Sequence, residues 1–147
     1  MHPAVVVSEL LVSGLLLAVA AAIIWLPARV EVTVEGDAVV VTPRGFDALL
    51  CLRGRIVVPL AAVAMVRVVP RREAPRTGLR RPGTAVPGLV LAGSYGSGEQ
   101  RTFWDVRRAE RVLVVSCRLG SEYKALVVEV PEPDAVAERL NAALVAR

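Results

Sequence analysis

The sequence holds one histidine, His2, and two cysteines, Cys51 and Cys117. Two cysteines are too few for a disulfide scaffold, and because both lie in apolar runs we expect small buried thiols in a reducing compartment. A Cys-His nucleophile needs histidine near the thiol, and a zinc site with only two cysteines needs further ligands such as histidine, but the lone histidine stands at the far N-terminus. The sequence therefore predicts no catalytic residue, no metal ligand and no cofactor site.

Aromatic residues are also scarce, at 4% of the chain. Proteins that bind single-stranded nucleic acid combine a basic groove with stacking aromatic rings. Tyr95, Phe103 and Trp104 are too few for such a platform, so we expect no nucleic-acid partner. Phe103 and Trp104 are neighbours in a strand-like run and point to opposite faces. One is expected in the core and the other at least partly exposed, either beneath a long loop or available to a membrane or a partner.

Carboxylates are densest at Glu129, Glu132 and Asp134, where a strand-like run passes into a helix-like one. This context predicts solvated side chains that favour the positive end of a helix, and not a catalytic pair. An enzyme remains possible only if the fold assembles a site from residues far apart in the sequence.

The stretch GSYGSGEQRT, residues 93–102, places Gly93 and Gly98 at the spacing of a phosphate-binding loop. Such a loop needs a lysine after its last glycine and leads from a strand into a helix. Here Glu99 and Gln100 follow Gly98, and the next residues read as a strand. The stretch is therefore predicted to be a hairpin turn between two strands.

One long apolar run is present: from Ala4 to Leu26 the only charged residue is Glu9. A helix of this length would extend about 34 Å at 1.5 Å per residue, enough to cross a hydrocarbon core of about 30 Å. We expect a transmembrane helix over residues 4–27. The alternatives are a cleaved signal peptide, which would need a more basic start, and a buried core helix, which would need a larger domain.

Lysine and arginine follow this run and do not precede it. Arg29, Arg44, Arg53 and Arg55 come first, and the positive-inside rule assigns them to the cytoplasm. The expected topology is a single pass through the plasma membrane, with the N-terminus outside and the C-terminal domain in the cytoplasm.

After Arg29 the pattern changes to alternation. Val30, Val32 and Val34 alternate with polar residues, and Gly36-Asp37 then turns the chain into AVVVT, so a hairpin is expected. Further strands are predicted over 48–52, 55–59, 64–69, 88–95, 100–106, 111–117 and 123–130. The stretch PEPDAVAERLNAALVAR is predicted to form an amphipathic helix with Val136, Leu140, Ala143 and Leu144 on its apolar face. The fold class is mainly β: a small antiparallel sandwich or barrel, closed at its open end by one C-terminal helix.

Positive charge is concentrated in one segment. The stretch from Arg67 to Arg81 holds six arginines against Glu73 alone and accounts for the whole excess of +5 that residues 28–147 carry. It falls largely within 70–88, which reads as a long loop. Near an anionic membrane each basic residue contributes on the order of 1 kcal/mol. The candidate lipid-contact residues are Arg71, Arg72, Arg76, Arg80 and Arg81; the alternative is a solvated loop that serves topology and solubility.

The order of these elements resembles bacterial membrane proteins with a pleckstrin-homology-like (PH-like) domain. The resemblance is carried by the apolar helix, the hairpin VEVTVEGDAVVV, the run RGRIVVPLAAVAMVRVV with its Pro-Leu step, and the later strands with their closing helix. It covers residues 30–145 and implies a seven-stranded bent sandwich, tethered to a bacterial membrane and without known catalysis. Eukaryotic relatives bind inositol phosphates through a basic first hairpin loop. The corresponding turn here, Glu35-Gly36-Asp37, is acidic, so that ligand site is not expected.

These features together predict a membrane-anchored, non-catalytic binding or scaffolding module that contacts anionic lipid headgroups and an unidentified protein partner. The alternatives are an accessory subunit of a larger membrane complex and an enzyme whose site is not visible in the sequence.

Overall fold

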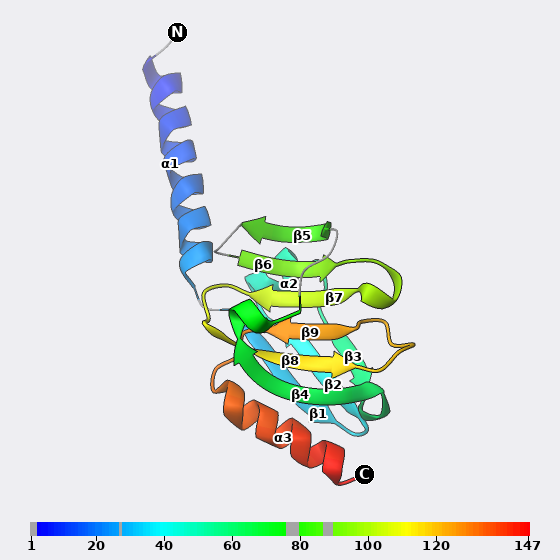
Figure 1. Cartoon of the computed structure of the whole chain (residues 1–147). Coiled ribbons are helices and arrows are strands. Elements are labelled where there is room, and N and C mark those ends of the chain that lie inside the picture. The colour runs from blue at the N-terminus through cyan, green and yellow to red at the C-terminus, as the bar shows by residue number, and fades with distance from the viewer. Residues whose placement is uncertain (1–2, 27, 76–79, 87–89) are drawn as a thin grey trace.

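In a computed structural model the chain forms a long N-terminal helix and a β-rich domain (Figure 1). The structure describes residues 3–26, 28–75, 80–86 and 90–147; for Ile24, residues 80–86 and Val90 it describes the backbone alone. Helix α1, Pro3–Trp25, projects away from the domain with most of its side chains exposed. Over Pro3–Ile23 it is long and apolar enough to cross a membrane. The predicted helix is confirmed, and its exposure contradicts the alternative of a buried core helix.

Two β-sheets make up the described part of the domain. The first has the strand order β1-β2-β3, with bounds Val30–Glu35, Ala38–Pro43 and Ile56–Pro59. The second has the order β4-β8-β9-β7-β6-β5; in chain order its strands are Val63–Pro70, Arg80–Val86, Val90–Tyr95, Thr102–Val106, Arg111–Cys117 and Ala125–Val128. Short 3₁₀ turns η1, η2 and η3 span Leu60–Ala62, Arg71–Glu73 and Gly98–Gln100.

The pairing follows the sequence pattern with one exception. Strands β7 and β9 run parallel, so the second sheet is mixed and not the purely antiparallel sheet that was predicted. The nine strands within the described residues also exceed the seven that the PH-like resemblance implies. The coarse prediction of a mainly β sandwich with a C-terminal helix is confirmed.

Both predicted hairpins are present. Strands β1 and β2 pair antiparallel around Gly36-Asp37, with Val34 opposite Val39. Strands β6 and β7 pair around the glycine-rich stretch, with Tyr95 opposite Thr102. Gly96 has a φ of 79°, and a Cβ there would lie 2.6 Å from the backbone oxygen of Gln100. The glycine therefore serves a tight turn, as predicted, and the stretch is no phosphate loop.

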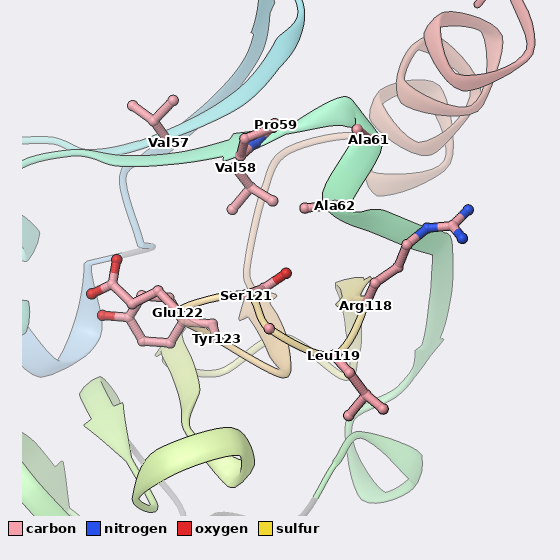
Figure 2. Close-up of a pocket in the computed structure, with 11 residues that line it drawn as sticks. Val57, Val58, Pro59, Ala61, Ala62, Arg118, Leu119, Ser121, Glu122 and Tyr123 are labelled. Atoms are coloured by element: carbon pink, nitrogen blue, oxygen red, sulfur yellow. The ribbon is translucent and has the colours of Figure 1, made fainter.

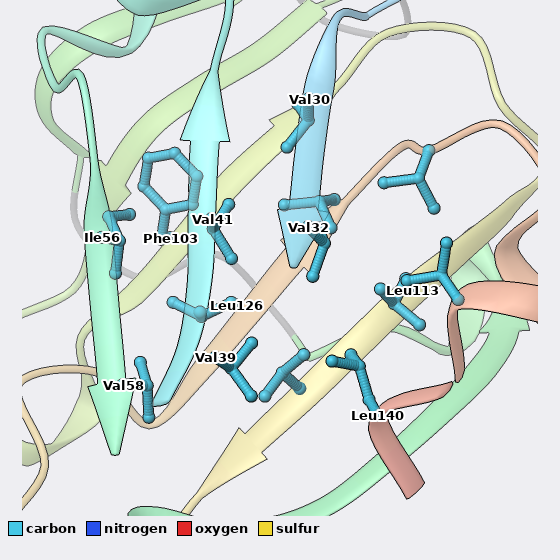
Figure 3. Close-up of a cluster of buried hydrophobic side chains, with 14 of the residues drawn as sticks. Val30, Val32, Val39, Val41, Ile56, Val58, Phe103, Leu113, Leu126 and Leu140 are labelled. Atoms are coloured by element: carbon cyan, nitrogen blue, oxygen red, sulfur yellow. The ribbon is translucent and has the colours of Figure 1, made fainter. Parts of the chain in front are cut away.

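Valines and a few larger side chains fill the space between the two sheets (Figure 3). Val39, Phe103, Leu113 and Leu126 are among those fully buried, and each such side chain stabilises the fold by about 1.5–3 kcal/mol. Helix α3, Pro133–Val145, packs near β1, β4 and β8 and buries Leu140. The C-terminal helix therefore closes one end of the sandwich, as the sequence predicted.

Three local predictions are wrong. Residues 48–52 were expected as a strand, but α2, Phe46–Cys51, is a helix that begins after Gly45 and ends at Leu52 in a left-handed conformation. A short apolar run has no periodicity that separates a strand from a helix. The expected loop over 70–88 contains β5, whose backbone pairs with β6. Trp104 is 4% exposed and not partly exposed as expected, and it belongs to a second cluster on the outer face of the larger sheet. Ala74, from the predicted loop, also packs against this cluster, which agrees with the alternative that the ring lies beneath that loop.

Candidate functional site

Helix α1 meets the domain at a buried ion pair, which we call the helix joint. Arg107, directly after β7, forms a salt bridge with Asp47 of α2, and their side chains are 3% and 1% exposed. The same guanidinium donates hydrogen bonds to the carbonyls of Ile23 and Leu26, at 2.6 and 2.7 Å. The other carboxylate oxygen of Asp47 accepts the amide of Arg29. A cation satisfies the carbonyls that a helix C-terminus leaves without partners, so Arg107 ties the end of α1 to the domain.

Glu129 holds the turn that carries this arginine. One carboxylate oxygen accepts the backbone N–H groups of Arg107, Arg108 and Ala109, at 2.7, 3.1 and 3.3 Å. Glu129 is half-buried, so the prediction of a solvated side chain is wrong for this residue. The turn sets the Arg108 guanidinium over the ring of Trp25, 3.8 Å from its centroid, which is a cation–π contact at the end of α1.

The other two members of the acidic cluster are exposed, as predicted. Asp134 stands in the first turn of α3 and forms a two-pronged ion pair with Arg111, at 2.7 and 2.9 Å. This pair neutralises one of the arginines discussed next.

A basic hollow of about 770 Å³ lies beside the helix joint. Its walls are η2 with the end of β4 and the turn between β7 and β8; the lining residues are Pro70, Arg71, Arg72, Arg108, Ala109, Glu110 and Arg111. The two walls are tied together because the Arg71 amide donates to the Glu110 carbonyl and its guanidinium to the Arg107 carbonyl.

The charge of the basic hollow is only partly compensated. Within the described residues neither Arg71 nor Arg108 has a carboxylate partner, and Arg72, 84% exposed, has only a 3.8 Å contact with Glu73. Glu110 is the one acidic residue among those that line it. Three guanidinium groups therefore gather at the end of the domain where α1 finishes.

The predicted lipid-contact residues are divided by the structure. Arg71 and Arg72 line the basic hollow. Arg76 lies outside the described residues, as do the side chains of Arg80 and Arg81, whose backbone belongs to β5 at the opposite edge of the sheet from β4. In place of these, the fold brings Arg108 and Arg111 beside Arg71 and Arg72.

Sequence reasoning missed Arg107 and Arg108. The signal was an arginine doublet directly after a predicted strand, in a part of the chain whose overall charge is balanced. Only the strand order shows that this doublet and the end of β4 share one edge of the domain.

A second buried acid, Asp105, lies inside the sandwich on the same face of β7 as Phe103. It is fully buried, and neither carboxylate oxygen has a hydrogen-bond partner of ordinary geometry among the described residues. Burial, followed by the charge of Asp47, raises the pKa of Asp105 to about 7. Burial also raises the pKa of the neighbouring Cys51 thiol well above its usual value, with Asp105 adding to the effect. Cys51 is therefore the buried thiol that was predicted.

These ionisable groups are almost completely buried. Asp47, Asp105 and Arg107 are each at most 2% exposed, although Asp47 and Arg107 also line a hollow of about 220 Å³. In the part of the chain that the structure describes, no three His, Cys, Asp or Glu side chains are arranged to hold a metal ion. Cys117 is half-buried, and burial raises the pKa of its thiol to about 11.

Comparison of the chain with protein-family models, with curated proteins and with solved structures finds no match. The class of protein is therefore defined by the geometry alone. It is a domain of two β-sheets with a C-terminal helix, preceded by one apolar helix that is long enough to span a membrane.

Proposed function

We propose that this protein is a single-pass membrane-anchored binding module that contacts anionic lipid headgroups through its basic hollow. The observation that carries this proposal is the gathering of Arg71, Arg72 and Arg108, whose charge is only partly compensated by carboxylates in the described chain, at the end of the domain nearest α1. With α1 in a bacterial plasma membrane and its N-terminus outside, the domain lies in the cytoplasm.

The contact between Arg108 and Trp25 supports this placement. Tryptophan prefers the membrane–water interface, and Trp25 is the last residue of the apolar helix. The Arg108 guanidinium, stacked on Trp25, would lie at the level of the headgroups. The two walls of the basic hollow lie at the same edge of the domain and would therefore also be near the headgroups. Three such cations near an anionic surface would contribute about 3 kcal/mol of attraction at low salt.

The proposed domain is PH-like and non-catalytic. A filled interior, a first hairpin at the start of the sandwich and a helix at its open end support the PH-like assignment, whereas the parallel pair of β7 and β9 departs from it. The low exposure of Asp47, Asp105 and Arg107, each at most 2%, supports a binding role over catalysis.

The lipid contact is tested with the full chain in nanodiscs of phosphatidylcholine, with or without phosphatidylglycerol. We expect phosphatidylglycerol to slow backbone hydrogen exchange in residues 71–73 and 107–111. Raising the salt from about 0.1 to 1 M should remove this protection, because the Debye length falls from about 10 to 3 Å. The double variant Arg71→Gln/Arg72→Gln should lose most of it at low salt.

The matched control is Arg55→Gln/Arg118→Gln, which removes the same charge from exposed arginines that do not line the basic hollow. It should retain the protection. Equal protection in both kinds of nanodisc, or an equal loss in the control, would leave these arginines as a solvated loop.

A further inference from the structure

A second hollow, of about 580 Å³, lies between strand β3 and the turn that joins β8 to β9 (Figure 2). We call it the β3 groove. It is lined mainly by apolar groups, among them Val57, Val58, Ala62, Leu119 and Tyr123. Hollows of this size are typical of ligand sites. In Figure 1 the turn between β8 and β9 lies at the opposite end of the domain from α1, so the groove is separate from the basic hollow.

The β3 groove runs along the edge of a sheet. β3 is the last strand of the order β1-β2-β3 and pairs with no other strand on its outer side within the described residues. Successive residues of a strand point to opposite faces, yet the groove is lined by the consecutive residues Val57, Val58 and Pro59. A hollow that touches consecutive residues follows the strand edge and not one face.

The register shows which backbone groups face that edge. Leu60 donates its amide to the carbonyl of Asp37, and these two residues continue the register in which Val39 lies opposite Val58. Hydrogen-bonded pairs alternate along an antiparallel ladder, so Val58 bonds to β2, whereas Val57 does not. The N–H and C=O of Val57 therefore point outwards. Pro59, which lacks an N–H, occupies the next outward position, where proline is tolerated.

The rim of the β3 groove is positively charged. Its one lining acid, Glu122, is neutralised by Arg53 at 2.7 Å and contacts Arg101 at 3.7 Å. Arg118 lines the groove and has no ion-pair partner in the described part of the chain. Next to it, Leu119 is 88% exposed, as an apolar contact residue would be before a partner binds.

We propose that the β3 groove binds an extended peptide segment of a partner protein, with alternating apolar and acidic side chains, as a fourth strand beside β3. The outward backbone groups of Val57 would supply main-chain hydrogen bonds, the apolar lining would take alternate side chains, and Arg118 would pair with an acidic one. Four residues of such a strand cover about 13 Å, the length of β3. A second copy of this chain is a poorer occupant, because the basic rims of the two identical grooves would repel each other. The proposal does not depend on the lipid contact.

The first test uses two fluorescently labelled peptides and the full chain in detergent micelles. The acidic probe has the sequence of residues 30–35, VEVTVE, which already forms a strand in this protein. The basic probe replaces both glutamates by lysine. The wild-type chain should bind the acidic probe more tightly in an anisotropy titration. Arg118→Glu should lower the affinity for the acidic probe by about fivefold and should raise the affinity for the basic probe. The reason is that a charge at the rim attracts a peptide of opposite charge and repels one of the same charge.

The second test asks whether the probe pairs with the edge of β3. Val57→Pro removes the outward N–H but none of the hydrogen bonds to β2. It should lower the affinity for the acidic probe by about tenfold, which is the equivalent of one to two hydrogen bonds. Val57→Thr keeps the N–H and is the matched control. If Val57→Pro does not fold, the charge swap at Arg118 decides alone. The proposal is overturned if the wild-type chain binds neither probe, or if Arg118→Glu leaves the preference between the probes unchanged.

Discussion

Replacing Asp47 by alanine is expected to lower the free energy of unfolding by about 3–5 kcal/mol. The change leaves the Arg107 guanidinium buried without its carboxylate, and a buried charge that has lost its partner is strongly destabilising. It also removes the acceptor of the Arg29 amide, so hydrogen exchange at that amide should accelerate. The measurement is a urea titration of the full chain in micelles, followed through Trp104 fluorescence in a Trp25→Phe background.

Two further variants show whether the loss comes from the buried charge. Arg44→Gln removes a partner from the exposed pair of Arg44 and Glu31, whose side chains are 62% and 50% exposed, and should change the stability by less than about 1 kcal/mol. Asp47→Ala/Arg107→Met removes both buried charges and should be less destabilised than the sum of the two single variants. If the losses in the free energy of unfolding were additive, Asp47 and Arg107 would contribute independently. The ion pair at the helix joint would then add nothing to the stability beyond the two separate side chains.

Asp105→Asn is expected to remove a pH dependence from the stability. The pKa of Asp105 is about 7 in the folded protein, above its ordinary value of 3.8. The folded state therefore holds this proton more tightly than the unfolded chain, so the associated stability is fully present below pH 4 and is lost as the pH rises to 7. At about 1.4 kcal/mol per unit, the loss amounts to at most roughly 4 kcal/mol.

The useful quantity is the difference in unfolding free energy between Asp105→Asn and the wild-type chain from pH 4 to pH 8. As the pH rises, the variant should become more stable relative to the wild-type chain. A loss of stability caused by the amide itself would be the same at every pH and would not change this trend. The charged and titratable neighbours of Asp105 are Asp47, Cys51, Arg107 and Glu129. Asp37→Asn, in the exposed turn between β1 and β2, is the matched control. A pH-independent difference for Asp105→Asn would show that its carboxyl keeps an ordinary pKa in the folded state.

The sequence predicted the elements whose pattern is local. The apolar helix, the hairpin of β1 and β2, the turn at Gly96 and the apolar face of α3 were all found where they were expected. Each is specified by a periodicity or a turn residue that acts over a few positions. Residues 46–51 were misread because a run of six residues carries too little periodicity to distinguish a helix from a strand.

The candidate sites were only half predictable. The arginine-rich segment pointed to Arg71 and Arg72, but Arg108 joins them through the pairing of distant strands. The β3 groove has no sequence signal, because Val57 becomes an edge residue only when the strand order ends at β3. Glu129 was expected to be solvated, and Asp105 drew no prediction of its own. Nothing in their immediate sequence shows that Glu129 binds three backbone amides or that Asp105 lies inside the core.

By itself the sequence determined the exposed apolar helix, the valine-rich strands and the helix that closes the sandwich, because hydrophobic spacing and turn chemistry act along the chain. Only the tertiary structure decided which charges meet. The salt bridge between Asp47 and Arg107 joins residues 60 positions apart, and the Arg107 bond to Ile23 joins residues 84 positions apart. Electrostatic partners are set by distance in space, and that distance is fixed by the order and register of the strands.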